Sequence, residues 1–387
     1  MDYNKIVQGI LDIGEAMLQS GAENFRLEDS FYRMCRSYGF KRSDVFVIPS
    51  NIQVTVETPE GEIITQIRHI ESSEPNFDQL DYLNNLCRYV CQHTPDENEM
   101  REKYLEVINR EPQKRITRYA AGIMGGTGFA VFFGCNLWDA VIAFIVSVMI
   151  VAVGDWLAKR ESNLLVYNGI LAFISEVIII GALKMGIADH PDRIMIGIVM
   201  LLISGLSTTN GIRDLLQRDF ISGFINIMNS FLGAAGIAFG IGLAIILFHE
   251  GYSDHFILNH SVPIQLLSCT VACTGFALWF KIRGKQVWYN SIGAFFTWAI
   301  YVGIYAWKPS NFLATMIAAV FVAFFAFIMS RVNKAPSTIF LTASVFPLIP
   351  GPNLYYVMYG CVSQDIELAF NETIILLATC LSIAFGF

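Results

Sequence analysis

A polar stretch interrupts an otherwise apolar part of the chain at residues 205–223, "GLSTTNGIRDLLQRDFISG". It follows the apolar run "IMIGIVMLLIS", and a second long apolar run comes after it. A connection between helices needs only roughly two to eight residues. The stretch resembles the start of a helix, whose free amides bind anions. We therefore predict that it lines a cavity and binds a carboxylate, through Gly205, Thr208, Thr209, Asn210, Arg213 and Asp214. The alternative is an amphipathic helix at the inner membrane surface, with Arg213 and Arg218 on lipid phosphates.

Carboxylates within apolar segments indicate a second kind of chemistry. Glu176 lies in the middle of "ILAFISEVIIIGAL", and Asp155 lies near the end of another apolar run. An intramembrane carboxylate is costly and is often a proton or ion carrier. We predict Glu176 as the main proton-coupling residue, with Asp155 and Asp219 as further candidates. Glu176 could instead be a neutral hydrogen-bonding group between helices, and Asp155 could cap the inner interface beside Lys159 and Arg160.

The composition predicts a soluble domain followed by a membrane domain. The chain has 387 residues, of which 54% are hydrophobic and 15% charged, whereas soluble domains carry about 25% charged residues. Residues 1–115 hold 13 Lys and Arg against 20 Asp and Glu, and the remainder holds 13 of each. No basic, apolar signal peptide opens the chain.

Residues 1–115 are predicted to form a small α+β domain. Amphipathic helices are expected over 4–19 and 23–38, a β-rich segment over 45–70 with "PEGE" as its hairpin turn, and helices over 77–92 and 96–110. The charged cluster of this domain is interpreted as a salt-bridged first helical turn rather than an active site. It comprises Glu23, Asn24, Arg26, Glu28 and Asp29.

Nothing in the motifs indicates an enzyme or a bound cofactor. GxSxG, HExxH, Walker and dinucleotide-binding patterns are missing, and no His lies in an apolar span. The eight cysteines include no CxxC pair, so neither a metal site nor a disulfide framework is predicted. His249, His255 and His260 lie in a predicted outer loop, which is interpreted as a plain polar loop.

Ten apolar segments are long enough to cross a bilayer, which needs roughly 20 residues as a helix. The twelve basic residues at the predicted inner ends, against three at the outer ends, place both termini in the cytoplasm. The expected spans are 116–135, 138–157, 164–186, 191–207, 221–248, 262–281, 288–307, 310–330, 336–350 and 368–387.

An internal repeat organises these spans into two halves, 116–250 and 262–387. A shift of 146 residues superposes "IAFG" at 237–240 on "IAFG" at 383–386, and a shift of 147 superposes two copies of "TGFA". Because each half has five spans, the second copy enters the membrane from the opposite side. Inverted repeats with helices interrupted by Gly or Pro are typical of secondary transporters. The interruptions are "ISGLSTTN" and "FPLIPGPN", and the second carries Pro347, Pro350 and Pro352.

The sequence resembles the threonine/serine exporter family. The segment "SGAENFRLEDSFYRMCRSYG" resembles the family's cytoplasmic signature. The segments "LISGLSTTNGIRDLLQRDFISG" and "APSTIFLTASVFPLIPGPNLYYVMYG" resemble the family's two membrane motifs. One departure is "ISG", where the family commonly has a proline before the glycine. The matching positions are Gly21, Ala22, Glu23, Arg26, Glu28, Gly205, Thr209, Asn210, Arg213, Asp214, Asp219, Gly223, Pro336, Pro347, Pro350, Gly351 and Tyr355.

The resemblance implies a proton-motive-force-dependent exporter of small polar amino acids in a bacterial inner membrane. Its partners would be a small carboxylate-bearing solute, protons and the lipid bilayer, without nucleic acid, and the sequence leaves a homo-oligomer open. An exporter of succinate or another small dicarboxylate is the alternative, and a channel or membrane sensor is the alternative of another class. The second-half residues that we expect at the substrate are Pro350, Gly351, Asn353, Tyr355 and Tyr356.

Overall fold

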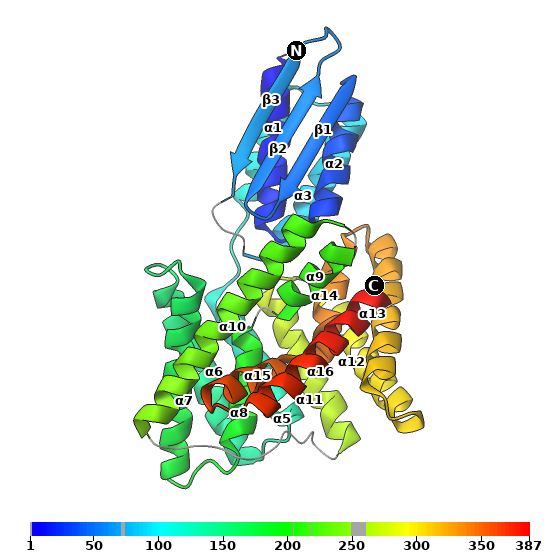
Figure 1. Ribbon diagram of the computed structural model, residues 1–387. Coiled ribbons are helices and arrows are strands. Elements are labelled where there is room, and N and C mark those ends of the chain that lie inside the picture. The colour runs from blue at the N-terminus through cyan, green and yellow to red at the C-terminus, as the bar shows by residue number, and fades with distance from the viewer. Residues whose placement is uncertain (1, 71–73, 204, 217, 249–260) are drawn as a thin grey trace. The chain divides into compact units, whose positions relative to one another are not determined.

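The computed structural model describes residues 2–70, 74–203, 205–216, 218–248 and 261–387 (Figure 1). The chain divides into two compact units. Unit 1 comprises Met1–Gln113, Phe280–Arg283 and Ala326–Ile339, and unit 2 comprises Lys114–Trp279, Gly284–Phe325 and Phe340–Phe387.

Unit 1 combines four helices of the N-terminal segment with a three-stranded antiparallel sheet (Figure 1). The sheet order is β1-β2-β3, with Val45 opposite Val54 and Thr55 opposite Thr65. The elements are α1 (Tyr3–Gln19), α2 (Asn24–Ser37), β1 (Arg42–Ile48), β2 (Asn51–Glu57), β3 (Ile63–His69), α3 (Phe77–His93) and α4 (Glu97–Ile108).

The core of unit 1 follows from the spacing of its apolar residues. Alternate residues of β2 point to one face, so Ile52, Val54 and Val56 are all buried. The apolar stripe of α1, formed by Ile6, Ile10, Ile13 and Leu18, is buried as well. Burial raises the pKa of the Cys87 thiol in α3 to about 12, because a low-dielectric interior disfavours the thiolate.

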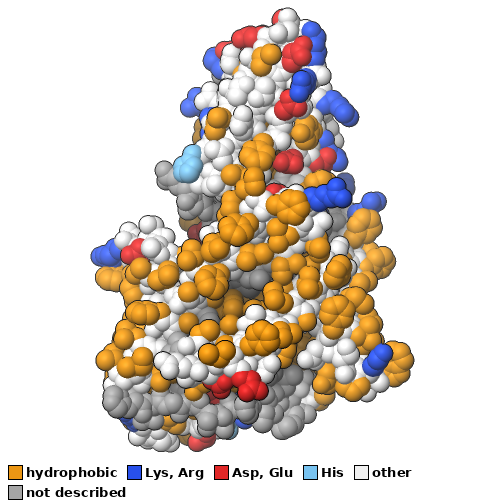
Figure 2. Space-filling view, in the orientation of Figure 1, with side chains coloured by type: hydrophobic (Ala, Val, Ile, Leu, Met, Phe, Trp, Pro, Cys, Tyr) orange, Lys and Arg blue, Asp and Glu red, His pale blue; other side chains and the backbone are white. Residues whose placement is uncertain are grey.

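Unit 2 is helical, and its helices have the length and composition of membrane spans. Six helices are long and apolar enough to cross a bilayer among the residues that the structure describes: α6 (Leu137–Leu157), α7 (Leu164–Lys184), α10 (Phe220–Phe248), α11 (Val262–Trp279), α13 (Asn311–Asn333) and α16 (Ile366–Gly386). Hydrophobic side chains cover most of the face over α10 and α16 (Figure 2). Phe224, Phe231, Phe239 and Phe370 on these helices are each at least 60% exposed. Such a surface suits lipid, so the chain is a polytopic membrane protein.

The membrane part has further helices beside these six, and two of them are interrupted. Those without an interruption are α5 (Arg115–Phe132) and α12 (Lys285–Trp307). The interrupted ones are α8 (Pro191–Leu202) followed by α9 (Gly205–Leu216), and α14 (Ser337–Val345) with the 3-10 turn η1 (Phe346–Leu348) followed by α15 (Gly351–Val362).

Both interruptions have the same backbone geometry. Ile203 has φ −78° and ψ 130°, and Ile349 has φ −66° and ψ 126°, so each residue is extended where the helix ends. Pro350 follows Ile349 and disfavours a helical conformation there, because the residue before a proline is forced towards extended geometry. No proline lies at the first interruption. The predicted position of each break is therefore confirmed, and the first break forms without a proline.

The bounds of the elements repeat with the period found in the sequence. Leu202 ends α8 and Leu348 ends the 3-10 turn η1 that follows α14. Gly205 and Gly351 begin the second short helix of each pair, and both pairs of positions are 146 apart. α5 and α11 share both bounds at a separation of 147. The α5–α11 contact is also reciprocal: a Cβ at Gly128 would lie 2.9 Å from Ala272, and a Cβ at Gly275 would lie 2.5 Å from the nitrogen of Gly125.

Candidate functional site

A cavity of about 280 Å³ lies beside the second helix break in unit 2. The 3-10 turn and the proline-rich segment after it form one wall, and four further helices and the α5 end complete the cavity. The lining residues are Phe129, Phe132, Phe133, Met200, Trp298, Tyr301, Asn311, Thr315, Pro347, Leu348, Ile349, Pro350, Pro352, Asn353, Glu372, Ile375 and Thr379.

Aromatic rings make up a large part of this wall. The rings of Phe132 and Trp298 meet edge to face, with centroids 4.7 Å apart. Trp298 stacks on Tyr301 at 4.6 Å, and its indole N–H donates to Gln265 Oε1 at 3.0 Å. These contacts hold the rings in place, so the cavity presents preformed aromatic surfaces.

The one charged residue of the described lining, Glu372, is hydrogen-bonded to an amide on the neighbouring helix. Asn353, in the first turn of α15, donates from Nδ2 to Oε2 of Glu372 on α16 at 2.8 Å. Tyr301 donates its hydroxyl to Asn311 Oδ1 at 3.2 Å. Among the described lining residues, Glu372 is the one charged group, and Lys, Arg and His are missing.

The second-half residues expected at the substrate fall into two groups. Pro350 and Asn353 line the cavity. Gly351 lies against α8, where an added Cβ would meet the flexible side chain of Met200. Tyr355 and Tyr356 are buried and meet edge to face at 5.3 Å, and they are not among the residues that line the cavity.

Glu176 lies fully buried in the middle of α7. Its carboxyl group lies within electrostatic range of the hydroxyl of Tyr355, as does that of Asp192 on α8. The structure therefore brings the predicted proton-coupling carboxylate near a tyrosine of the second helix break, from the other half of the chain.

The first-half motif lies on α9. Thr208 and Thr209 belong to this helix, as does Gly205 at its start, but their side chains lie outside the described part of the structure. Asn210 and Arg213 are half-buried. The cavity beside the second break has none of these residues in its wall.

Two acidic residues of the first-half motif make short-range contacts. Asp214 accepts a hydrogen bond from Asn226 Nδ2 on α10 at 3.0 Å. Asp219 lies just before α10 and accepts from the backbone N–H of Ser222 at 3.2 Å, which is the geometry of a helix N-cap. Asp365 occupies the same place before α16 and accepts from Leu368 N at 3.0 Å.

Asp155, the remaining proton-coupling candidate, forms an ion pair with a residue of another helix. Its carboxylate lies 2.9 Å from the guanidinium of Arg118 on α5. Lys159 and Arg160 are not its ion-pair partners here, and Arg160 instead lies over the ring of Trp156. The contact joins α5 to the end of α6.

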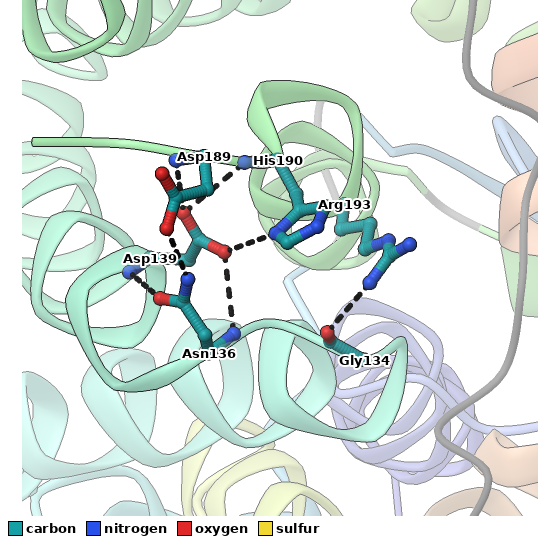
Figure 3. Close-up of polar contacts among 6 residues, drawn as sticks. All are labelled: Gly134, Asn136, Asp139, Asp189, His190 and Arg193. Carbon is teal, nitrogen blue, oxygen red and sulfur yellow. Dashed lines mark hydrogen bonds and ion pairs between the residues drawn. The ribbon is translucent and has the colours of Figure 1, made fainter. Parts of the chain in front are cut away.

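A buried polar network that we did not predict connects α6 to the segment before α8 (Figure 3). Asp139 is fully buried and accepts from the backbone N–H groups of Asn136, Asp189 and His190 and from His190 Nδ1 at 2.9 Å. Asn136 in turn accepts from Asp139 N, which completes a capping box. The pattern "NLWD" is the signal that could have located the cap, because an Asn followed three residues later by an acid favours a helix start.

The charged cluster of the cytoplasmic signature makes its contacts inside unit 1. Glu23 accepts from the hydroxyl of Thr338 at 3.0 Å, and Arg26 hydrogen-bonds to Ser337. Arg26 also pairs with Glu23 at 3.3 Å. The salt bridge agrees with the interpretation of a paired first helical turn. The predicted outer-loop histidines, His249, His255 and His260, lie outside the described residues. Over the described residues, no group of three or more His, Cys, Asp or Glu is arranged to hold a metal ion.

Interrupted helices beside a cavity of about 280 Å³, within a polytopic membrane unit, are typical of the class of membrane transporters. Two family models match the chain: one described as "Putative threonine/serine exporter" over residues 8–248, and one described as "Threonine/Serine exporter, ThrE" over residues 265–387. The chain therefore belongs to the threonine/serine exporter family, whose members are transporters and not enzymes.

Two curated proteins are similar over most of the chain. The threonine/serine exporter of Corynebacterium glutamicum is 24% identical over 97% of this chain and 79% of its own length. The probable threonine/serine exporter of Mycobacterium tuberculosis is 21% identical over 93% of this chain and 71% of its own length. No solved structure matches the chain significantly.

Proposed function

We propose that this chain is a secondary exporter of small amino acids, with threonine and serine as first candidates, driven by the proton motive force. The observation that carries the proposal is the cavity of about 280 Å³ at a broken helix. Cavities for drug-sized ligands measure roughly 300–1,000 Å³, so this one suits a small solute. Broken helices are tolerated at membrane depth where they line such a cavity.

The proposed architecture is ten membrane spans in two inverted halves of five, preceded by a cytoplasmic domain. The element bounds that recur after 146 or 147 residues support the repeat. The reciprocal Gly128–Ala272 and Gly275–Gly125 approaches support a pseudo-two-fold axis, because a two-fold contact pairs each residue with its partner's equivalent. An engineered cysteine within 331–335 should be labelled from the cytoplasmic side only, and labelling from outside intact cells would disprove this topology.

The first-half motif is the proposed binding site for the substrate carboxylate, through Asn210, Arg213 and the amides at the start of α9. This helix has 12 residues and begins at Gly205, as the second short helix of the other half begins at Gly351. Its N-terminal amides and the half-buried guanidinium of Arg213 supply positive charge for an anion.

Glu176 is the proposed proton carrier. A carboxylate that is fully buried in a span can bind a proton from one face and release it to the other, if the two faces are exposed in turn. Its electrostatic interaction with Tyr355 supports the proposal, because it places the carrier near the second helix break. Asp155 and Asp219 are weaker candidates, since the first pairs with Arg118 and the second caps α10.

Transport into vesicles under an imposed pH gradient tests the function. The Glu176→Gln variant keeps the shape and hydrogen-bonding capacity of the side chain but cannot titrate. We expect it to exchange threonine in counterflow at a rate close to that of the unmodified protein, while net transport driven by the pH gradient is lost.

The matched control is Glu161→Gln, which removes a carboxylate from the segment before α7 and retains the oxygen that accepts from Asn163 N. Full pH-driven transport by Glu176→Gln would assign Glu176 to structure. Uptake of succinate without threonine would favour the dicarboxylate alternative, and flux without coupling to any gradient would favour a channel.

A further inference from the structure

The cavity beside the second helix break has the composition of a cation site. Glu372 is the one charged residue among its described lining residues. Its Oε2 accepts from Asn353 Nδ2 at 2.8 Å, which orients the carboxylate. A carboxylate has about four lone-pair sites, so this hydrogen bond leaves most of its capacity for a ligand.

The aromatic walls favour the same ligand charge. The faces of aromatic rings attract cations, and ammonium groups are often bound among several rings. Phe129, Phe132, Trp298 and Tyr301 all line the cavity, and stacked or edge-to-face contacts connect them. Rings and carboxylate thus act together on a positively charged group.

The same composition disfavours a doubly negative solute. Over the described lining there is no Lys, Arg or His to neutralise a second carboxylate. A dicarboxylate would bring two like charges close to Glu372 in a partly desolvated cavity, where Coulomb repulsion is much stronger than in water. An amino acid presents an ammonium group instead.

We propose that Glu372, oriented by Asn353, binds the ammonium group of the transported amino acid, so that this cavity selects primary amines over carboxylates that lack an amine. The proposal deepens the exporter function above and rests on it for the identity of the solute. It assigns the ammonium group to the second half of the chain.

Ligand binding to the purified full chain tests the proposal without requiring transport. Three probes separate the functional groups: L-threonine, isopropanolamine, which lacks the carboxylate, and β-hydroxybutyrate, which lacks the amine. We expect threonine and isopropanolamine to raise the melting temperature, and β-hydroxybutyrate to leave it unchanged.

The Glu372→Gln variant should lose the response to isopropanolamine and bind threonine about ten- to a hundredfold more weakly, as expected for a lost charged hydrogen bond. The matched control is Glu367→Gln, an exposed acid in the first turn of the same helix, which should behave like the unmodified protein. Glu372→Asp keeps the charge and should keep the selectivity for amines. If Glu372→Gln does not fold, amine selectivity in Glu372→Asp carries the test.

Three results would overturn the ammonium site: unchanged isopropanolamine binding by Glu372→Gln, tight binding of β-hydroxybutyrate by the unmodified protein, or loss of amine selectivity in Glu372→Asp. Failure of the exporter function gives a different pattern. In that case vesicles would transport no threonine under any gradient, while amine binding that depends on Glu372 would persist.

Discussion

The two halves of unit 2 contain the same backbone break with different side chains around it. In each half the helical segment before the break ends at a leucine, in α8 or in the 3-10 turn η1. An extended isoleucine follows, and a second short helix begins at a glycine. In each half, a hydrogen bond also joins a carboxylate and a side-chain amide on the two helices that follow the break. The carboxylate is on the short helix in the Asp214–Asn226 bond, and on the long helix in the Asn353–Glu372 bond.

Equivalent positions of the two halves carry different chemical groups. Asn226 and Glu372 are 146 positions apart on equivalent long helices, and one is an amide where the other is a carboxylate. Arg213 likewise matches Tyr359. The repeat therefore preserves the geometry that breaks the helix and places different charges on its two copies.

The largest effect should come from the glycines that bring the two halves together. A side chain at Gly275 would collide with the backbone of Gly125, so Gly275→Leu should prevent stable folding. Overpacking costs about 1–3 kcal/mol or more, and backbone cannot move aside easily. The yield of folded protein and its melting temperature measure the effect.

Gly128→Leu should be similarly harmful, because Gly128 meets the equivalent surface at Ala272. Gly303→Leu is the control, since nothing lies within 4 Å of an added Cβ there. A well-folded Gly275→Leu variant would contradict a close α5–α11 contact and weaken the case for the two-fold axis.

The next effect concerns the charge difference between the halves. Arg213→Ala should weaken threonine affinity and export by about tenfold or more, because a charge-assisted hydrogen bond to the substrate carboxylate would be lost. Counterflow in proteoliposomes at varied threonine concentrations measures both quantities. Tyr359→Phe, at the matched position, should change them by less than about twofold. Unchanged affinity in Arg213→Ala would remove the anion site from the first-half motif.

The smallest effect should be the same in both halves. Asp219→Ala and Asp365→Ala each remove an N-cap acceptor, and the loss of such a cap costs about 1 kcal/mol. Equal decreases in melting temperature, with pH-driven transport preserved, would assign both residues to structure. Loss of proton coupling in Asp219→Ala alone would instead restore Asp219 as a proton carrier.

Local patterns were sufficient to predict the breaks and most helix bounds. The helix expected over 4–19 is α1 (Tyr3–Gln19), and the interruption expected around 203–205 lies at Ile203. Prolines and glycines act on their immediate neighbours, so their effect can be predicted from the sequence. The role of Glu372 could not be predicted in this way, because it depends on a cavity formed by helices distant in the chain.

The difference between local patterns and tertiary packing also applies to Asp155 and to the capping box at Asn136. Spacing allowed Asp155 to lie beside Lys159 and Arg160, which are close in sequence, but it could not indicate the ion pair with Arg118 on another helix. The capping box at Asn136 is a local pattern. The contact of Asp139 with His190, by contrast, joins the start of α6 to the start of α8. Side-chain partners chosen by tertiary packing are beyond what spacing alone can predict.

The Asp139 network has a mechanical consequence for α8. Its hydrogen bonds hold the segment just before this helix against the start of α6, while the other end of α8 stops at the break after Leu202. The helix is thus anchored at His190, and Met200 near its other end lines the cavity. With a rise of about 1.5 Å per residue, a tilt of α8 by roughly 10° about His190 would move Met200 by about 3 Å. A small rotation at the fixed end would therefore be enough to widen or close the cavity.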